Sequence, residues 1–154
     1  MAKLSPDKLH LDDYLPYRLS VASNRVSRLI AKLYQDRFGL SIWQWRVLAI
    51  LGAQTGLTAG QVAKRAAMDK MAVSRAVSAL LARGLVARKT AKHDARARIL
   101  SLTQTGMGIY TEIAPLAREQ EQHLLAGFSA DDVEAATRFL LALEARAVEL
   151  AGDD

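Results

Sequence analysis

Two short helical patterns and a pair of strands follow one another in residues 58–103, TAGQVAKRAAMDKMAVSRAVSALLARGLVARKTAKHDARARILSLT. The run Thr58-x-x-Gln61 is a capping box, which predicts the start of a short helix. Asp69 is a good N-cap for a second helix, and Gly84 is placed to end it. Two adjacent helices of this kind are typical of a DNA-reading module, in which the second helix enters the groove.

The apolar spacing changes from helical to alternating after this second helix. Residues 85–89 and 98–102 are therefore expected to pair as a hairpin, with the polar residues between them forming a long tip. Residues 58–103 contain ten lysines and arginines against two aspartates, a net charge of +8, whereas the whole chain carries +5. A positive surface this local is attracted to the phosphate backbone of a nucleic acid.

The composition excludes several classes of protein and site. The 154 residues include no cysteine, which excludes disulfides, thiolate zinc sites and cysteine redox sensors. The three histidines lack the spacing of metal ligands, so we expect no metal and no cofactor. No apolar run approaches the ~20 residues of a membrane helix, and no secretory apolar core follows the start. These observations predict a soluble cytoplasmic protein with no membrane partner.

Two further helices are expected before the basic window. Asp12 or Asp13 is placed to cap a long helix, with Pro16 in or near its first turn. Gly39 is placed to end that helix in the left-handed conformation. A second capping box, residues 41–44, then starts the next helix.

Two acidic helices are expected after the hairpin. Thr103 would begin the first of them, and Gly106 and Gly108 would weaken its first turns. Residues 104–154 contain three arginines against ten acids, a net charge of −7, so DNA would repel them. Their apolar stripes exceed what one small DNA-reading domain could cover. We therefore expect a homodimer in which the terminal helices of two chains pack together.

Four blocks of this sequence resemble the MarR family of bacterial transcription regulators. They are residues 40–48 (LSIWQWRVL), residues 58–66, residues 69–75 followed by residues 80–86, and residues 94–103 (DARARILSLT). The last block is similar to the family's wing pattern, which is Asp-x-Arg followed by an alternating strand and Thr. The resemblance covers nearly the whole chain.

The resemblance implies a mainly α fold, namely a winged helix-turn-helix with a small antiparallel β-hairpin wing and a helical dimerisation lobe. Residues 40–103 would form the DNA-binding domain. Residues 10–38 and 104–151 would form the dimerisation lobe. Two positions depart from the family pattern. Met71 stands where many relatives have a small polar residue, and Gly60 lies inside the short helix, where it costs up to ~1 kcal/mol of helix propensity.

The reading helix would place its N-terminal residues against base edges in the major groove. Arg75 could donate two hydrogen bonds to a guanine, at O6 and N7, and Met71 offers only apolar contact, for example to a thymine methyl. By resemblance, Arg96 at the wing tip would enter the minor groove, and Asp94 would pair with Arg96 and set its direction. The residues expected to contact DNA are Thr58, Gln61, Lys70, Met71, Ser74, Arg75, Lys92, Arg96 and Arg98.

Simpler structural roles compete with some of these assignments. Gln61 could serve only as a capping partner, Arg75 could be a solvated charge, and the wing tip could be a flexible basic loop. A catalytic pair of His93 and Asp94 is not expected, because neighbours in a mobile tip cannot be held for proton transfer. No catalytic constellation occurs in the sequence, so we do not expect an enzyme.

The family usually couples DNA binding to a small ligand held between the dimerisation lobe and the DNA-reading domain. The expected ligand-binding residues are Tyr14, Arg18, Trp43 and Arg46. Arg18 or Arg46 could bind a carboxylate with Trp43 as a stacking wall, which would suit an aromatic acid or its thioester. Alternatively, Trp45 and Tyr17 are core residues, and Arg46 binds a carboxylate of this protein.

The leading interpretation is a ligand-responsive transcription regulator that binds double-stranded DNA. It would act as a repressor, bind a pseudo-palindromic operator as a homodimer, and be released by a small effector. The alternatives are a winged-helix module that binds an acidic protein, and an architectural DNA-binding protein with little sequence preference.

Overall fold

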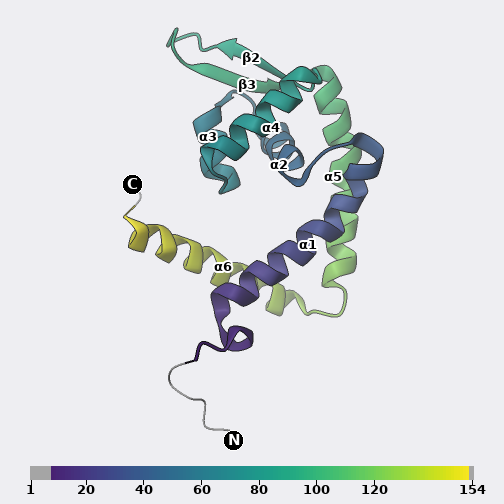
Figure 1. Cartoon of the computed structure of the whole chain (residues 1–154). Helices are drawn as coiled ribbons and strands as arrows, with labels where there is room; N and C mark the ends of the chain where they lie inside the picture. The colour runs from purple at the N-terminus through teal and green to yellow at the C-terminus, as the bar shows by residue number, and fades with distance from the viewer. Residues whose placement is uncertain (1–7, 153–154) are drawn as a thin grey trace, which may run out of the picture. The chain divides into compact units, whose positions relative to one another are not determined.

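The computed structural model describes residues 8–152, which form helices and one small sheet (Figure 1). The elements in chain order are a 3-10 helix η1 (Leu11–Asp13), α1 (Leu15–Phe38), α2 (Ile42–Ala53), β1 (Leu57–Thr58), α3 (Ala59–Ala66), α4 (Lys70–Ala82), β2 (Val86–Thr90), β3 (Arg98–Leu102), α5 (Gln104–Leu125) and α6 (Ala130–Ala151). The mainly helical class with an antiparallel hairpin is therefore confirmed. The chain divides into two compact units, one ending at Ala117 and one beginning at Arg118.

Side-chain caps determine where α2, α3 and α4 begin, as the sequence predicted. Ser41 accepts a hydrogen bond from the backbone N–H of Gln44 at 3.1 Å, which completes a capping box before α2. Thr58 and Gln61 form the same arrangement before α3. Asp69 accepts from the first turn of α4 at 2.8 Å. Each cap satisfies backbone donors that a helix leaves without a partner.

The start of α1 differs from the prediction, because neither Asp12 nor Asp13 caps it. Both aspartates lie in η1, and the N-cap of α1 is Tyr14, which makes no side-chain capping bond. Pro16 occupies the first turn, where its missing N–H costs nothing and its fixed φ favours the helix. Gly39 ends α1 with a φ of 62°, as expected.

The sheet contains a third strand that the sequence analysis missed. Its order is β1-β3-β2, all antiparallel, and the two-residue β1 pairs Leu57 with Leu100 of β3. On the other edge of β3, Val86 of β2 pairs with Leu102. Because Leu57, Leu100 and Val86 are buried, the base of the wing is anchored in the core, while the β2–β3 tip projects beyond α3 and α4 (Figure 1).

One hydrophobic core holds the first unit together. Its largest fully buried side chains are Tyr34, Leu40, Leu48, Leu51, Leu80, Leu100, Ile113, Val47, Val62, Val73 and Val77. Helix α2 lies against both α3 and α4, so these three helices pack as a compact group. The inner face of α4 is buried by this packing, and its outer face is left to solvent.

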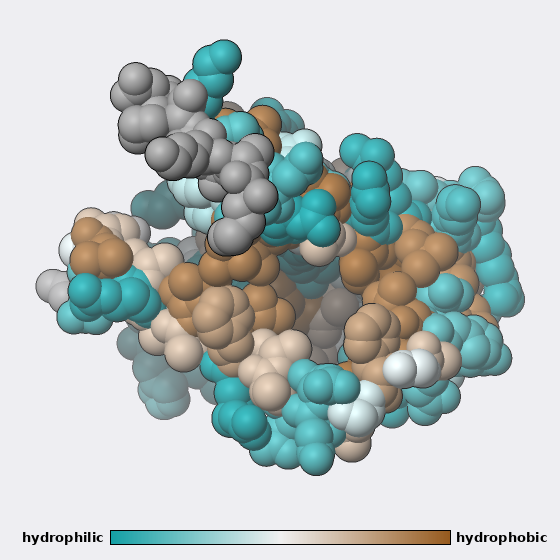
Figure 2. All heavy atoms as spheres, turned by 90° about the horizontal axis from the view of Figure 1, so that it is seen from below, coloured by the Kyte–Doolittle hydropathy of each residue, from teal (hydrophilic) through white to brown (hydrophobic). Residues whose placement is uncertain are grey.

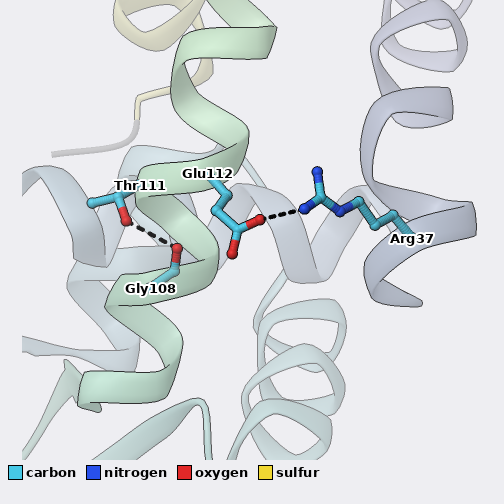
Figure 3. Close-up of polar contacts among 4 residues, drawn as sticks. All are labelled: Arg37, Gly108, Thr111 and Glu112. Carbon is cyan, nitrogen blue, oxygen red and sulfur yellow. Dashed lines mark hydrogen bonds and ion pairs between the residues drawn. The ribbon is translucent and has the colours of Figure 1, made fainter.

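An ion pair joins the end of α1 to α5 within the first unit. Arg37 extends toward Glu112, and Nη2 lies 2.6 Å from Oε2 (Figure 3). Both side chains are more than half exposed, so solvent screens the pair and its contribution to stability is small.

The second unit contains the end of α5 and all of α6. Ser129 and Asp132 form a capping box at the start of α6. No residue of α6 is buried in the single chain, although it carries several large apolar residues. The exposed ones in this unit are Leu124, Phe128, Phe139, Leu140, Leu141, Val148 and Leu150. Figure 2 shows apolar surface open to view on one side of the molecule.

None of the helices in residues 8–152 combines the length and apolar character that crossing a membrane requires.

Candidate nucleic-acid interface

The outer face of α4 presents the four residues of this helix that the sequence predicted to contact DNA. Lys70, Met71, Ser74 and Arg75 are all exposed, and Met71 retains 66% of its accessible surface. Their spacing places them on one side of the helix, while Val73 faces the core. An exposed methionine among three polar residues has no packing role within the chain, so this face is available to a partner.

Helix α3 begins with both of its predicted DNA-binding side chains engaged in capping. The Gln61 side chain accepts from the backbone N–H of Thr58 at 2.9 Å, and the Thr58 hydroxyl accepts from the backbone N–H of Gln61 at 3.2 Å. Gln61 is exposed and Thr58 is half-buried. The capping role of Gln61 is therefore present, and its amide NH₂ remains able to donate to a phosphate.

The wing tip is organised differently from the expectation for Asp94. Asp94 accepts from the backbone N–H of Arg96 at 2.9 Å, so it shapes the turn and does not bind the guanidinium. Across the hairpin, Arg98 donates to the hydroxyl of Thr90 at 2.6 Å. Lys92 and Arg96 are exposed at the tip. Arg96 consequently has no carboxylate partner within the described residues.

Arg88 is a cation of this surface that the sequence analysis did not select. It lies on β2 and borders a pocket of about 180 Å³, together with Lys70 and Ser74 of α4 and the start of α3. The alternation of β2 identifies Arg88 as a strand residue. Its proximity to α3 and α4 depends on the tertiary fold, so no local signal could have found it.

The predicted ligand-binding residues are not gathered in one place. Only Arg46 lines the large pocket of the first unit, which has a volume of about 510 Å³. Trp43 is 49% exposed and borders a smaller pocket beside Arg75. Tyr14, the N-cap of α1, and Arg18 in its first turn are exposed and line none of these pockets.

The alternatives proposed for neighbouring residues are partly wrong. Among residues 8–152 Arg46 binds no carboxylate: it donates to the carbonyl oxygen of Ala66 at 3.4 Å, and its guanidinium lies 5.4 Å from the Trp43 ring centroid. Tyr17 is 39% exposed in the single chain and does not belong to its core. Trp45 does pack against the core, as expected.

The large pocket brings together residues of α1, α2 and α3 that are distant in the sequence. Its polar members are Ser27, Tyr34, Arg46 and Arg65, and its remaining lining is apolar or aromatic. Burial raises the pKa of the Tyr34 hydroxyl above its usual value, and the nearby Arg46 opposes that shift. Tyr34 is therefore neutral at physiological pH, and the two arginines supply the positive charge of the pocket.

Comparison with known proteins identifies relatives of this arrangement. Residues 38–97 match a model of the MarR family. A MarR-family transcriptional regulator from Silicibacter pomeroyi is 28% identical, with 91% of this chain and 92% of that chain covered and a TM-score of 0.72.

Two more distant structures share the fold. A MarR/EmrR-family regulator from Acinetobacter sp. ADP1 is 21% identical, with 92% of this chain and 99% of that chain covered and a TM-score of 0.85. BpsR from Bordetella bronchiseptica is 24% identical, with 89% and 97% covered and a TM-score of 0.79. Members of the matched family are transcription regulators and not enzymes. By its sequence match over residues 38–97 and by its fold, the chain is similar to the MarR family of winged helix-turn-helix transcription regulators.

Proposed function

We propose that this protein is a homodimeric repressor that binds a pseudo-palindromic operator and is released by a small aromatic acid. The observation that carries the DNA-binding role is the exposed face of α4. Lys70, Ser74 and Arg75 lie there with no acidic partner in the described part of the chain. A cationic helix face of this kind fits the major groove.

The basic window supplies both parts of the proposed DNA contact. Arg75 donates a bidentate pair of hydrogen bonds to a guanine edge, and Met71 contacts an apolar group such as a thymine methyl. Arg96 enters the minor groove from the wing tip, where a narrow A·T tract concentrates negative potential. Lys92, Arg98, Thr58 and Gln61 contact the backbone and fix the register.

Exposed apolar residues support the proposed dimer. In the second unit they include Phe139, Leu140 and Leu141, and at the start of the chain they include Leu11 and Leu15. Large apolar patches of this kind mark protein interfaces. A second copy of the chain would cover them, and its reading helix would meet a second half-site about one helical turn, roughly 10 bp, away.

The pocket of the first unit supports the proposed effector. Its volume of about 510 Å³ suits a small molecule. Arg46 and Arg65 offer guanidinium groups to a carboxylate, and Trp45 offers an aromatic wall. The structure of BpsR concerns regulation of that protein's DNA binding by 6-hydroxynicotinic acid, which is an aromatic acid. Ligand roles for Tyr14, Arg18 and Trp43 stay predictions, because these residues do not line this pocket.

The pocket is placed to couple ligand binding to DNA binding. It contacts α1, which belongs to the expected dimerisation lobe, and it contacts α3 through Arg65 and Ala66. A ligand that prefers one arrangement of these helices shifts the population toward it. The shift is limited by the difference in ligand affinity between the two arrangements.

The DNA-binding role is tested by fluorescence anisotropy with labelled promoter DNA. Arg75→Ala and Arg96→Ala should each weaken binding about tenfold or more, because each removes a charge-assisted contact. Arg138→Ala is the matched control: it also removes one arginine, but from α6, and should leave binding nearly unchanged. Equal affinities for all three variants, with the dimer intact, would contradict the proposal.

The effector role is tested by the thermal midpoint of unfolding with 6-hydroxynicotinate and benzoate. At least one of these aromatic acids should raise the midpoint, because a ligand stabilises the state that binds it. Arg46→Ala should abolish the rise, and Arg28→Ala, which removes an exposed arginine of α1 that does not line the pocket, should retain it. No rise with any aromatic acid would count against an acid-binding pocket, and a rise lost only in Arg18→Ala would place the ligand elsewhere.

A further inference from the structure

Gly60 has no packing reason to be glycine. It lies in the first turn of α3, and a Cβ added there would have the Thr58 hydroxyl as its only neighbour within 4 Å, at 3.9 Å. Its backbone does not adopt a positive φ, which would favour glycine. Alanine would therefore fit and would strengthen the helix. A position of this kind favours glycine when a ligand must approach the backbone closely.

The pocket beside Gly60 has the chemistry of an anion site. Its volume is about 180 Å³, several times the ~30 Å³ that one water occupies in the liquid. Lys70, Ser74 and Arg88 border it from α4 and β2, and Val73 and Val77 provide apolar lining. The three polar side chains are exposed and make no side-chain hydrogen bond or ion pair within residues 8–152.

We propose that this pocket binds one sugar–phosphate unit of duplex DNA. The inference rests on the proposed function, and it adds Arg88 and Gly60 to the residues proposed to contact DNA. Lys70 and Arg88 neutralise the phosphate, and the Ser74 hydroxyl donates to one of its oxygens. The missing Cβ of Gly60 lets the strand approach the backbone of α3.

The phosphodiester of DNA fits this pocket better than a free phosphate. A free phosphate would contact only the polar groups at the pocket, whereas a DNA strand continues beyond it along α4. Lys70 and Ser74, which border the pocket, are the sequence neighbours of Met71 and Arg75. When Met71 and Arg75 contact bases in the major groove, one strand of the DNA therefore passes over the pocket.

Gly60→Ala provides the sharpest test, because stability and binding should change in opposite directions. The thermal midpoint should rise, since alanine favours the helix. The affinity for promoter duplex should fall about fivefold to tenfold, since the methyl group occupies the space of the strand. Gly108→Ala is the matched control, because Gly108 is also helical and a Cβ there meets nothing within 4 Å. It should raise the midpoint and leave DNA affinity unchanged.

Arg88→Gln tests the charge of the site through the salt dependence of binding. The slope of log K against log salt should become shallower by about 0.9 for each subunit, as expected for one lost phosphate contact. Lys89→Gln removes the same charge from the next residue of β2, on the other side of the strand, and should change the slope less. Gly60→Ala combined with Arg88→Gln should lose less affinity than the sum of the two, because both act on one site.

The outcomes separate this inference from the proposed function. If the unmodified protein binds promoter DNA and both Gly60→Ala and Arg88→Gln bind it equally well, the phosphate site is wrong and the DNA-binding role stands. If the unmodified protein binds no duplex, both proposals fail. The proposed site would also be wrong if inorganic phosphate bound to the Gly60→Ala and Arg88→Gln variants with the same affinity as to the unmodified protein.

Discussion

Gly106 determines how closely the first turn of α5 approaches the base of the wing. A Cβ added there would lie 2.0 Å from the carbonyl oxygen of Leu85, a backbone atom that cannot rotate away. Thr103 holds the same junction: its hydroxyl donates to the Gly84 carbonyl at 2.6 Å and accepts from the Gly106 N–H at 3.0 Å. The sequence identified Gly106 only as a weak helix former, because the Leu85 contact is not local.

Gly106→Ala should therefore destabilise the protein by about 2 kcal/mol or more, since the overpacked backbone must shift. Gly108→Ala should instead stabilise it by about 0.5–1 kcal/mol, since nothing lies within 4 Å of the new methyl group and alanine favours a helix. Urea unfolding of both variants measures the difference. Equal free energies of unfolding would show that α5 can move away from Leu85 without cost.

Individual site residues were predictable from sequence where helical periodicity alone exposes them. Lys70, Met71 and Arg75 fall on the face of α4 opposite the apolar stripe, so their exposure followed from spacing. Arg88 and Arg65 were missed, because their neighbours come from other elements of the fold. The role of Asp94 was misjudged, because a carboxylate two residues before a backbone N–H readily forms a local turn.

The ends of α1 and α4 are connected through a single side chain. Arg83, the C-cap of α4, donates to the carbonyl oxygen of Phe38 at 2.6 Å and to that of Gly39 at 3.2 Å. Carbonyl groups at the end of a helix otherwise lack partners. The forked guanidinium thus satisfies the end of α1 and fixes the end of the reading helix against it.

Arg83→Lys keeps the charge but replaces the two-pronged donor with a single ammonium group. It should lower the free energy of unfolding by about 1 kcal/mol, the typical contribution of a hydrogen bond. It should also weaken DNA binding without changing the salt slope, because no phosphate contact is lost. A shallower slope in Arg83→Ala, together with full rescue by lysine, would identify Arg83 as a phosphate contact and contradict its positioning role.

Element boundaries were predictable wherever a capping box marked them, because the cap and its partner lie three residues apart. The starts of α2 and α3 follow this rule, and α4 starts after the single side-chain cap of Asp69. The start of α1 does not, because the aspartates before it enter a 3-10 turn and Pro16 supplies the helix start. Strand β1 was missed, because its two residues are stabilised only by pairing with the distant β3.

Across the whole molecule, charge and apolar surface are segregated along the chain. Residues 58–103 carry a net charge of +8, and residues 104–154 carry −7. The acidic part includes α6, whose apolar residues are exposed in the single chain. This separation supports the proposal that one part of the sequence contacts DNA and the other part contacts a second subunit.

Leu140→Glu should convert the dimer into monomers, because it places a charge in an apolar interface. Leu140→Met is the matched control, since it preserves the apolar character and should preserve the dimer. Sedimentation velocity at micromolar concentration distinguishes the two states, and far-UV circular dichroism checks the fold. A dimer in the glutamate variant would exclude this part of α6 from the interface.

The central claim is that two reading helices of one dimer bind duplex DNA at a fixed spacing. Hydroxyl-radical footprinting of promoter DNA tests it most directly. We predict two protected segments on one face of the duplex, with centres about one helical turn, roughly 10 bp, apart, and their loss in Arg75→Ala. A uniform footprint without phased protection, or none at concentrations where the dimer is intact, would contradict it.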